Sequence, residues 1–567
     1  MGKRCCSMFL AVVVLGLTGS AAAKTWTIFT NQVPKANEGD RDMRYELGTK
    51  FKATFGAQVL KVRVYASAAE EGEHTVRLWR VADSALVAGP YAWSFPSGAE
   101  GWKEFTLPEP VMIEGNTDYI VAVTNGTDQW YFCTERSFSS PINNGPLMTY
   151  VDSGVYTTTL GTMPDQTWNN SNYYRDVVIE ALPTASGPDP ADGALAVMTG
   201  LFRWAPGDGA RFHDVYLGTT QDLGPGDRVA ARMTKVLYFH PVPLEPGMTY
   251  YWRVDEIEAD GVTVHPGNVW SFMTQALTAY LPDPPDGATD VWPAPSLVWL
   301  PGQEAIKHHV YFSGSEEAVG QGAADADKGE FDDPNFTPGN LQPLTPYYWR
   351  VDEVVIDGPA RAGPVWSFTT CLPVDDFESY TNDSPKRIFQ TWLDGMGFSA
   401  DEFFPNGSAG NGSGSAVGYD PRQGNIMETS IVHGDRQSMP LDYNNVNAPF
   451  YSEAARDFAP AQDWTINDVN GLVLYVRGLT TNASAPLYVA IEDASKRVGV
   501  VAHPDPKVVT VTKWVKWKIA FRAFTDAGVN MARVKKMYIG VGDRQNPTAD
   551  GVGRIYVDDI CLTKPAP

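Results

Sequence analysis

The sequence predicts an all-β protein built as a string of four β-sandwiches, and three observations lead to this prediction. The 567 residues include 52 Gly, 42 Pro, 17 Trp, 25 Tyr and 25 Phe, which is typical of short strands joined by turns. Apolar and polar residues alternate over short runs such as Val59–Tyr65, as they do in half-buried strands. The stretch Tyr250–Glu256 recurs 97 residues later as Tyr347–Glu353, so one small sandwich is present twice in tandem.

The chain is long enough for several domains, because a single core rarely grows past about 250 residues. Its net charge of −23 argues against nucleic acid and anionic membranes as partners, since both attract a basic surface. Lys3 and Arg4 precede an apolar run, Met8–Leu17, and Ala21–Ala23 offers small residues for cleavage. We therefore predict a signal peptide over residues 1–23, too short to span a membrane. The expected product is a secreted, extracellular monomer, released or held at the cell surface without membrane insertion.

Residues 24–183 form the first predicted block. Thr75–Arg80 alternates like Val59–Tyr65, and Tyr119–Val123 is an apolar run of strand length, so we expect antiparallel strands bounded by turns. The order of these runs, with Tyr45–Phe51 before them, resembles a family of uncharacterised bacterial secreted domains that occurs beside fibronectin-like modules. The resemblance implies a β-sandwich of unknown function and no catalytic residue.

Residues 184–275 and 279–370 are the two copies of the repeat. Tyr250, Trp252 and Val254 alternate in the first copy, so on a strand they share the face that points into the core. In this pattern the repeats resemble fibronectin type III domains, whose sixth strand carries a corner tyrosine, here Tyr250 and Tyr347, and whose second strand carries a core tryptophan, here Trp204 and Trp299. The resemblance implies two spacer modules, and fold likeness alone gives them no ligand.

Each copy also carries an acidic pair, Asp255-Glu256 in the first and Asp352-Glu353 in the second. Two carboxylates can cleave a glycosidic bond when they lie about 5–10 Å apart across one cleft. Neighbouring strand residues point to opposite faces, so neither pair suits that chemistry. We expect these acids to be solvated strand ends.

Residues 371–567 form the last predicted block. It opens with Val374–Tyr380, closes with Ile555–Leu562, and holds strand-like runs such as Leu472–Val476 and Leu487–Ile491 between them. Its two ends resemble the terminal strands of jelly-roll carbohydrate-binding modules of the galactose-binding type. The resemblance implies a glycan ligand and a structural calcium ion held by acids of the terminal strands.

Calcium takes about six to eight oxygen ligands, which carboxylates of two neighbouring strands and loop carbonyls can supply. The candidate ligands are the acids of the two terminal runs: Asp376, Glu378, Asp558 and Asp559. Asp558 and Asp559 are adjacent, so only one of them is expected to point at the ion. In the alternative, these acids cap turns or face water.

A glycan site needs exposed aromatic faces beside polar groups. Five aromatic residues of the last block lie in loop-like surroundings rich in Gly, Asn and Asp: Trp392, Tyr419, Tyr443, Tyr451 and Trp464. We predict that these rings stack on pyranose rings, while Asn, Asp and Arg side chains bind the hydroxyl groups. In the alternative, each ring belongs to the core.

Other chemistry is not indicated by the sequence. No His-Glu-x-x-His zinc motif and no Gly-x-Ser-x-Gly nucleophile motif is evident, and the side chains of His308 and His309 would diverge on a strand. Cys371 and Cys561 bracket the last block, where they form either a disulfide or two small buried thiols.

The sequence thus predicts a secreted protein that is not an enzyme, in which three β-sandwiches present a C-terminal jelly roll. Its expected partner is a polysaccharide or a cell-surface glycan, and its expected role is adhesion. Three alternatives stay open. These are an extracellular scaffold that binds protein or matrix, a polysaccharide-degrading enzyme with its site in residues 371–567, and a recognition site in residues 24–183.

Overall fold

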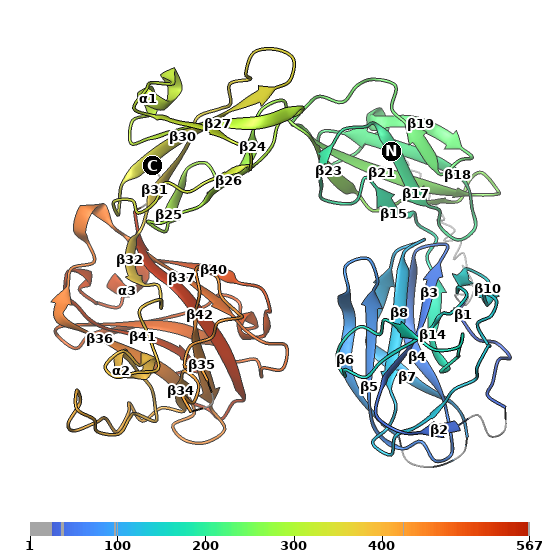
Figure 1. The fold of residues 1–567 in the computed structure, drawn as a ribbon, viewed down its shortest axis with the longest axis horizontal. Coiled ribbons are helices and arrows are strands. Elements are labelled where there is room, and N and C mark those ends of the chain that lie inside the picture. The colour runs from blue at the N-terminus through green and yellow to red at the C-terminus, as the bar shows by residue number, and fades with distance from the viewer. Residues whose placement is uncertain (1–24, 36–38, 96–97, 99, 423, 565–567) are drawn as a thin grey trace, which may run out of the picture. The chain divides into compact units, whose positions relative to one another are not determined.

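The computed structural model describes residues 25–35, 39–95, 98, 100–422 and 424–564. Strands dominate the described residues (Figure 1), and the α-helices among them are short: α1 (Glu316–Gln321), α2 (Ile388–Thr391) and α3 (Arg522–Thr525). The all-β prediction is therefore confirmed. The predicted signal peptide, residues 1–23, lies outside the described residues. The chain forms two compact units that divide between Gln275 and Ala276.

The N-terminal block of the first unit contains two antiparallel sheets that share a core. One has the order β1-β14-β4-β7, with bounds Thr25–Thr27, Arg175–Ala181, Ala57–Ala66 and Gly101–Ile113. The other has the order β10-β11-β3-β8-β5-β6, with bounds Asn143–Asn144, Leu147–Met148, Glu46–Ala53, Asp118–Thr124, Gly72–Arg80 and Ala85–Phe95. Next to it, β12 (Gly154–Thr157) pairs with β3 and with β13 (Gln166–Thr167). A separate pair joins β2 (Gly39–Arg41) to β9 (Trp130–Phe132).

Strand alternation fills the core between these two sheets. Val62 and Val64 of β4 are buried in one apolar cluster with Val121 and Val123 of β8. Each such valine contributes roughly 1.5–3 kcal/mol when it leaves water completely. The period of two that predicted these strands from the sequence is therefore also the period that places their side chains in the core.

Each repeat consists of two sheets, and the main strand order is the same in both repeats. The first repeat has β15-β17-β20 (Ser186–Asp189, Leu201–Ala205, Leu237–Phe239) and β16-β23-β21-β18-β19 (Ala194–Val197, Trp270–Thr274, Thr249–Glu258, Ala210–Gly218, Arg228–Met233), with β22 (Val264–His265) on β21. The second repeat has β24-β26-β29 (Tyr280–Asp283, Leu297–Leu300, Asn335–Phe336) and β25-β31-β30-β27-β28 (Ala288–Val291, Trp366–Thr370, Pro346–Val355, Ala305–Ser313, Asp327–Phe331).

The duplicated stretch forms the central strands β21 and β30. Trp252 and Val254 are completely buried, as their alternation predicts. The phenol oxygen of Tyr250 accepts a hydrogen bond of 3.0 Å from the backbone N–H of Glu245, which ties the start of the strand to the preceding turn. Tyr347 makes the same bond in the second repeat.

The acidic pairs are not solvated, so that prediction is wrong. Glu353 is completely buried, with Oε2 2.6 Å from His308 Nδ1 and with Oε1 accepting the backbone N–H of Gly302 at 2.8 Å. Glu256 makes the equivalent bond to His213 in the first repeat. A buried carboxylate is tolerated when donors surround it, and these donors come from segments distant in the sequence.

The other two acids are held by arginines of their own strand. Asp255 Oδ1 lies 2.7 Å from Arg253 Nε, and Asp352 Oδ1 lies 2.8 Å from Arg350 Nε. Side chains two residues apart share a face of a strand, so both acids lie beside a fixed positive charge. The pairs therefore stabilise the repeats and have no catalytic arrangement.

The C-terminal block contains a further pair of antiparallel sheets. One has the order β34-β35-β42-β37-β40, with bounds Ser415–Val417, Met439–Asn444, Val552–Thr563, Gly471–Arg477 and Val515–Ala520, and β32 (Leu372–Asp375) pairs with β42. The other has the order β33-β36-β41-β38-β39, with bounds Trp392–Leu393, Ser452–Gln462, Val534–Val541, Leu487–Asp493 and Val498–Ala502. Their inner faces share one large apolar cluster. Among the described residues, no helix has the length and apolar character needed to cross a membrane.

Candidate functional site

The sheet that contains β37 and β42 has one face in the core and one outside it. Leu472, Leu474 and Val476 of β37 belong to the core cluster, so alternation directs Tyr475 and Arg477 to the opposite face. We call the following set the outer face, because these side chains lie on that side of the sheet or against it: Tyr419, Asp442, Tyr475, Arg477, Lys516, Lys518, Arg554 and Tyr556. Its aromatic and charged character makes it the candidate binding surface.

An aromatic stack covers part of the outer face. The imidazole of His433 lies on the ring of Tyr475, with centroids 3.5 Å apart and an interplanar angle of 20°. The indole of Trp514 meets His433 edge-on at 5.8 Å, and its Nε1 donates to the carbonyl of Val432 at 2.8 Å. Lys516 Nζ lies 5.8 Å from the centroid of Tyr475. These contacts hold the loop of His433 against β37 and β40.

A bulge in β42 brings the two acids of this last strand, Asp558 and Asp559, to the loop of His433. The register between β42 and β37 shifts beside Asp558, and Asp559 has a φ of 46°. Asp558 Oδ2 accepts the backbone N–H of His433 at 2.9 Å, and Asp559 Oδ2 lies 2.6 Å from His433 Nδ1. The prediction that these neighbours point to opposite sides is therefore wrong, because a bulge interrupts the alternation of a strand.

Asp558 and Asp559 are largely shielded from solvent and closely packed against the loop of His433. Burial, and then the neighbouring carboxylate of Asp559, raise the pKa of Asp558 to about 8. Gly434 lies so close to Asp559 that a Cβ there would be 2.7 Å from its Oδ2. A side chain at this position would therefore have to displace the carboxylate of Asp559.

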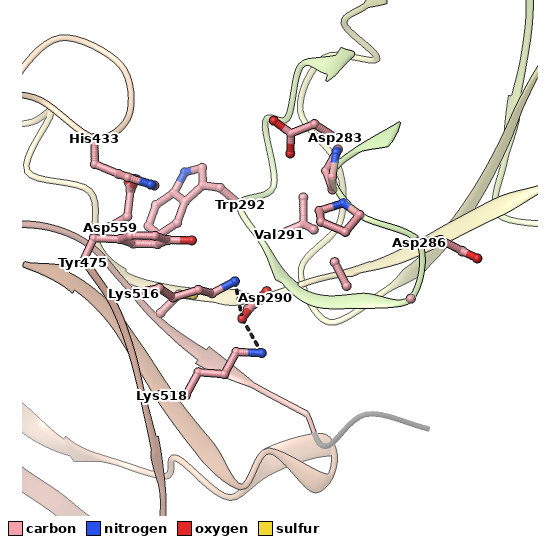
Figure 2. A pocket seen from close by; sticks show the side chains of 15 residues that line it. Asp283, Asp286, Asp290, Val291, Trp292, His433, Tyr475, Lys516, Lys518 and Asp559 are labelled. Atoms are coloured by element: carbon pink, nitrogen blue, oxygen red, sulfur yellow. Dashed lines mark hydrogen bonds and ion pairs between the residues drawn. The ribbon is translucent and has the colours of Figure 1, made fainter. Parts of the chain in front are cut away.

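A pocket of about 390 Å³ opens between the second repeat and the C-terminal block, and we call it the junction pocket. Figure 2 shows the indole of Trp292 turned toward His433 and Tyr475 across it. Its lining comes from both parts: Asp283, Pro284, Pro285, Asp286, Gly287, Ala288, Asp290, Val291 and Trp292 of the repeat, and His433, Tyr475, Lys516, Lys518, Asp559 and Cys561 of the C-terminal block. The pocket thus combines aromatic rings with hydrogen-bonding groups of both charges.

One carboxylate of the pocket joins its two walls. Asp290 Oδ2 lies 2.7 Å from Lys516 Nζ and 2.6 Å from Lys518 Nζ (Figure 2). Burial acts to raise the pKa of Asp290, but the two lysine hydrogen bonds outweigh it and hold that pKa below its ordinary value. Asp290 is therefore ionised and fixed between the two ammonium groups.

Three of the five predicted glycan-binding rings are in the core, which corrects the prediction. Trp392, Tyr443 and Trp464 are 0%, 2% and 1% exposed. Their polar atoms are bound inside: Trp392 Nε1 donates to Asp375 Oδ2 at 2.8 Å, and the Tyr443 hydroxyl donates to the carbonyl of Ala483 at 2.7 Å. Trp392 lies on β33 and Tyr443 on β35, and all three rings belong to the core cluster between the sheets, so they cannot face a sugar.

The other two predicted rings are half-buried. The hydroxyl of Tyr419 donates to Glu428 at 2.6 Å, and the guanidinium of Arg554 lies 4.7 Å from its ring centroid. Arg554 in turn binds Asp442, with Nε 2.6 Å from Oδ1. Tyr419 therefore belongs to the outer face, whereas Tyr451 lies apart from it, beside Gly542. The glycan role of both residues stays a prediction.

The four predicted calcium ligands are bound to protein donors. Glu378 Oε1 accepts the backbone N–H groups of Arg436 and Gln437 at 2.8 Å, and Asp376 Oδ1 accepts that of Glu378 at 3.1 Å. Among the described residues, no group of three or more His, Cys, Asp or Glu side chains is placed to hold a metal ion. As they lie, these acids accept hydrogen bonds from protein donors, and calcium stays a prediction from the sequence.

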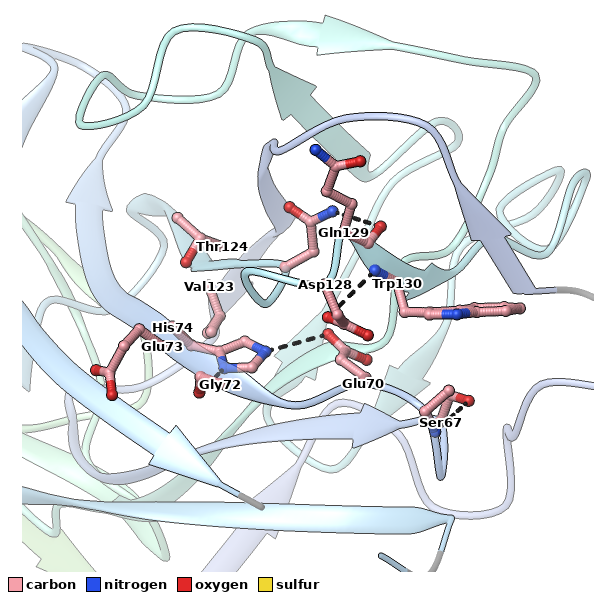
Figure 3. Close-up of polar contacts among 12 residues, drawn as sticks. Ser67, Glu70, Gly72, Glu73, His74, Val123, Thr124, Asp128, Gln129 and Trp130 are labelled. Atoms are coloured by element: carbon pink, nitrogen blue, oxygen red, sulfur yellow. Dashed lines mark hydrogen bonds and ion pairs between the residues drawn. The ribbon is translucent and has the colours of Figure 1, made fainter. Parts of the chain in front are cut away.

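A second polar cluster lies inside the N-terminal block. Glu70, His74 and Arg175 are at most 1% exposed, and Glu70 Oε1 lies 3.3 Å from Arg175 Nη2 and 3.4 Å from His74 Nε2. Figure 3 shows the Glu70–His74 contact beneath Asp128, whose Oδ1 accepts the backbone N–H of Trp130. A buried charge pair of this kind holds its segments in place, and we assign this cluster a structural role.

The sequence reasoning missed Trp292, His433 and the two lysines of the pocket. Trp292 lies in a repeat that the sequence predicts to be a spacer. Lys516 and Lys518 alternate on one strand, which signals a shared face but gives no partner for it. A usable signal was present, since the two repeats differ in sequence at the position of Trp292.

Comparison with known proteins gives one family and several distant structures. A family described as a domain of unknown function (DUF4082) matches residues 31–175. No protein of curated function matches the chain. One similar structure is the family 11 carbohydrate-binding module from Clostridium thermocellum, with 15% identity and a TM-score of 0.19, over 27% of this chain and 88% of that one.

Two further similar structures match different shares of this chain. A carbohydrate-binding module of the β-sandwich superfamily shows 12% identity and a TM-score of 0.27, over 50% of this chain and 97% of that one. An exo-β-agarase shows 9% identity and a TM-score of 0.21, and the match spans 27% of this chain and 23% of the agarase. Because these TM-scores are low, we base the functional proposal on the geometry of the site.

Proposed function

We propose that this chain is an exported, non-catalytic glycan-binding protein that holds a neutral glycan in the junction pocket and along the outer face. The observation that carries the proposal is the junction pocket itself, where the rings of Trp292 and Tyr475 stand beside carboxylate and ammonium groups. Sugar sites need this combination, since a pyranose has an apolar C–H face and a rim of hydroxyl groups.

The size of the pocket supports a small ligand or one segment of a polymer. A volume of about 390 Å³ lies in the usual range for ligand pockets, about 300–1,000 Å³. Beyond it, the outer face continues over β37 and β42 to the Arg554–Asp442 pair and Tyr419. A polymer bound in the pocket would find further hydrogen-bonding partners along this path.

The charge of the lining supports a neutral glycan over an anionic one. Four acidic residues line the pocket, Asp283, Asp286, Asp290 and Asp559, against Lys516 and Lys518. The carboxylate of Asp286 is turned away and accepts hydrogen bonds from Ser367 (Figure 2), which leaves three carboxylates beside the two ammonium groups. Both ammonium groups are already bound to Asp290. Sulfated or uronate polymers would bring further negative charge to a site with a carboxylate excess, and like charges at close range oppose binding.

The test is binding of the chain without residues 1–23 to neutral polymers (cellulose, xylan, agarose, mixed-linkage β-glucan) and anionic polymers (alginate, carrageenan). We expect binding to at least one neutral polymer, weakened about tenfold by Tyr475→Ala, since a lost aromatic contact of about 1.4 kcal/mol is one decade in Kd. The matched control is Trp168→Ala, because Trp168 lies in the N-terminal block and is 57% exposed. Equal loss in the control, or binding to anionic polymers alone, contradicts the proposal.

Two further measurements address catalysis and export. Incubation of the bound polymer with the purified chain should release no reducing ends, and measurable release would favour the polysaccharide-degrading alternative. Expression with the native N-terminus should give an extracellular chain that begins at Lys24, in line with the predicted signal peptide. If the chain binds no polymer of either class, the glycan proposal fails and the scaffold alternative takes its place.

A further inference from the structure

The two repeats offer an internal comparison, because equivalent positions can be matched through the sheet register. In the first repeat Val197 of β16 pairs with Thr274, and in the second Val291 of β25 pairs with Thr370. Val291 therefore corresponds to Val197. By the same match, Asp290 and Trp292 of the second repeat correspond to two other residues of the first, Ala196 and Met198.

These substitutions change the chemistry of one short segment and leave the fold as it was. Both repeats keep the parallel pairing of this strand, and both keep its flanking Asp-Gly-Ala sequence. What differs is that the second repeat has a carboxylate and an indole where the first has two apolar side chains. Such a difference is not needed for the sandwich, because the first repeat forms the same sheets without it.

The surroundings of the segment differ in the same way. In the first repeat Leu195, Ala196 and Met198 are exposed, whereas of their counterparts in the second repeat Thr289 and Asp290 are buried and Trp292 is half-buried. The segment of the second repeat is covered because β25 lies against β42 of the C-terminal block.

Two kinds of contact hold this interface. Asp290 binds both Lys516 and Lys518. Trp292 packs on the apolar cluster of Cys371, Val473 and Cys561. Ionic and apolar contacts thus coincide at the residues by which the second repeat differs from the first.

We propose that the second repeat is one half of the binding site, docked on the C-terminal block through Asp290 and supplying Trp292 as the aromatic wall of the junction pocket. The first repeat lacks both residues and serves as a spacer. This inference rests on the proposed function, because it assigns the ligand of the composite pocket as the same neutral glycan. Under this proposal only the first repeat is a spacer, whereas the sequence predicts that both repeats are.

The test exchanges each residue for its counterpart in the first repeat. Trp292→Met should weaken binding of the neutral polymer about tenfold while the protein stays folded, because methionine occupies this position in the first repeat without disturbing its fold. The matched control is Met198→Trp, which should leave binding unchanged. Asp290→Ala should also weaken binding. It should speed proteolytic cleavage of the full chain between residues 370 and 373 by roughly tenfold, since Cys371 of this connection is completely buried in the cluster on which Trp292 packs.

The outcomes separate the inference from the function on which it rests. If Trp292→Met binds within twofold of the unchanged chain while Tyr475→Ala loses binding, the composite site is wrong and the glycan function stands. If cleavage between residues 370 and 373 is unaffected by Asp290→Ala, docking through Asp290 is wrong. If the unchanged chain binds no polymer, the proposed function fails and the composite glycan site fails with it, whereas the docking result remains valid on its own.

Discussion

The imidazole of His433 lies nearly parallel to the ring of Tyr475, with centroids 3.5 Å apart. This contact joins a loop to strand β37 and forms part of the junction pocket. His433 is also held by Asp559 through Nδ1, so its ring is fixed from two sides. A fixed ring is a better surface for a ligand than a mobile one, because less conformational freedom is lost on binding.

The first prediction concerns this contact. We expect a double-mutant cycle of His433→Ala and Tyr475→Ala to give a coupling energy of about 1 kcal/mol in urea unfolding, the size usual for aromatic pairs. A matched cycle of His433→Ala with Lys536→Ala, on the other sheet of the block, should give a value near zero. Additive losses for His433 and Tyr475 would show that the rings are adjacent without stabilising each other.

The second prediction concerns a ring that the sequence assigned to sugar binding. Trp464 is 1% exposed and packs on Phe458 at 5.5 Å. Trp464→Ala should lower the free energy of unfolding by about 3–5 kcal/mol, because it leaves a large cavity in the core. The glycan Kd of the folded protein should not change. Ile466→Ala, at a neighbouring position that is 41% exposed, should cost under about 1 kcal/mol; a lower affinity with unchanged stability in Trp464→Ala would restore the sugar-binding role.

The third prediction concerns the buried carboxylate of the second repeat. Glu353→Ala removes the acceptor of both His308 and Gly302, and two buried polar groups without partners should lower stability by about 3 kcal/mol. Glu304→Ala is the matched control, because Glu304 forms an ion pair with Arg361 and its side chain is 72% exposed. Surface pairs of this kind contribute about 0–1 kcal/mol. Equal effects of the two variants would contradict the buried pairing.

The fourth prediction concerns pH. Burial raises the pKa of Glu453 above its ordinary value of 4.5, although Arg544 and the hydroxyl of Tyr488 oppose the shift. The folded state then holds the proton more tightly than the unfolded state, so this group stabilises the fold most at low pH. Its contribution is lost as pH rises from about 4.5 through the raised pKa.

Glu453→Gln should remove this loss, because glutamine resembles the protonated acid and does not titrate. Urea midpoints measured from about pH 4 to about pH 8 should fall less steeply in the variant than in the unchanged chain. Asp457→Asn is a control on the same strand, since the Asp457 side chain is 56% exposed. Identical slopes for Glu453→Gln and the unchanged chain would refute the raised pKa.

The fifth prediction is the calcium ion that the sequence suggested for Asp376, Glu378, Asp558 and Asp559. A ligand bound only by the folded state raises the melting temperature, so chelation should lower it by several degrees if the ion is present. Mg²⁺ in place of Ca²⁺ should not restore it, because Mg²⁺ prefers a smaller octahedral site. An unchanged melting temperature would mean that the protein donors seen here satisfy these acids without a metal.

The sequence by itself determined the all-β class, the duplication and the inward faces of regular strands. Trp252 and Val254 were placed correctly, because alternation is a local property of an extended chain. The same local rule failed at Asp558 and Asp559, where a bulge turned both acids toward one loop. Only pairing with β37 fixes where that bulge lies.

Tertiary structure alone decided which aromatic rings are buried and which line the junction pocket. Trp392, Tyr443 and Trp464 lie in polar, loop-like sequence, yet long-range packing buries them. Trp292 lies in a module that looked like a spacer, yet docking against the C-terminal block makes it a wall of the pocket. Burial depends on contacts between segments far apart in the sequence, and residue type in a local window does not report those contacts.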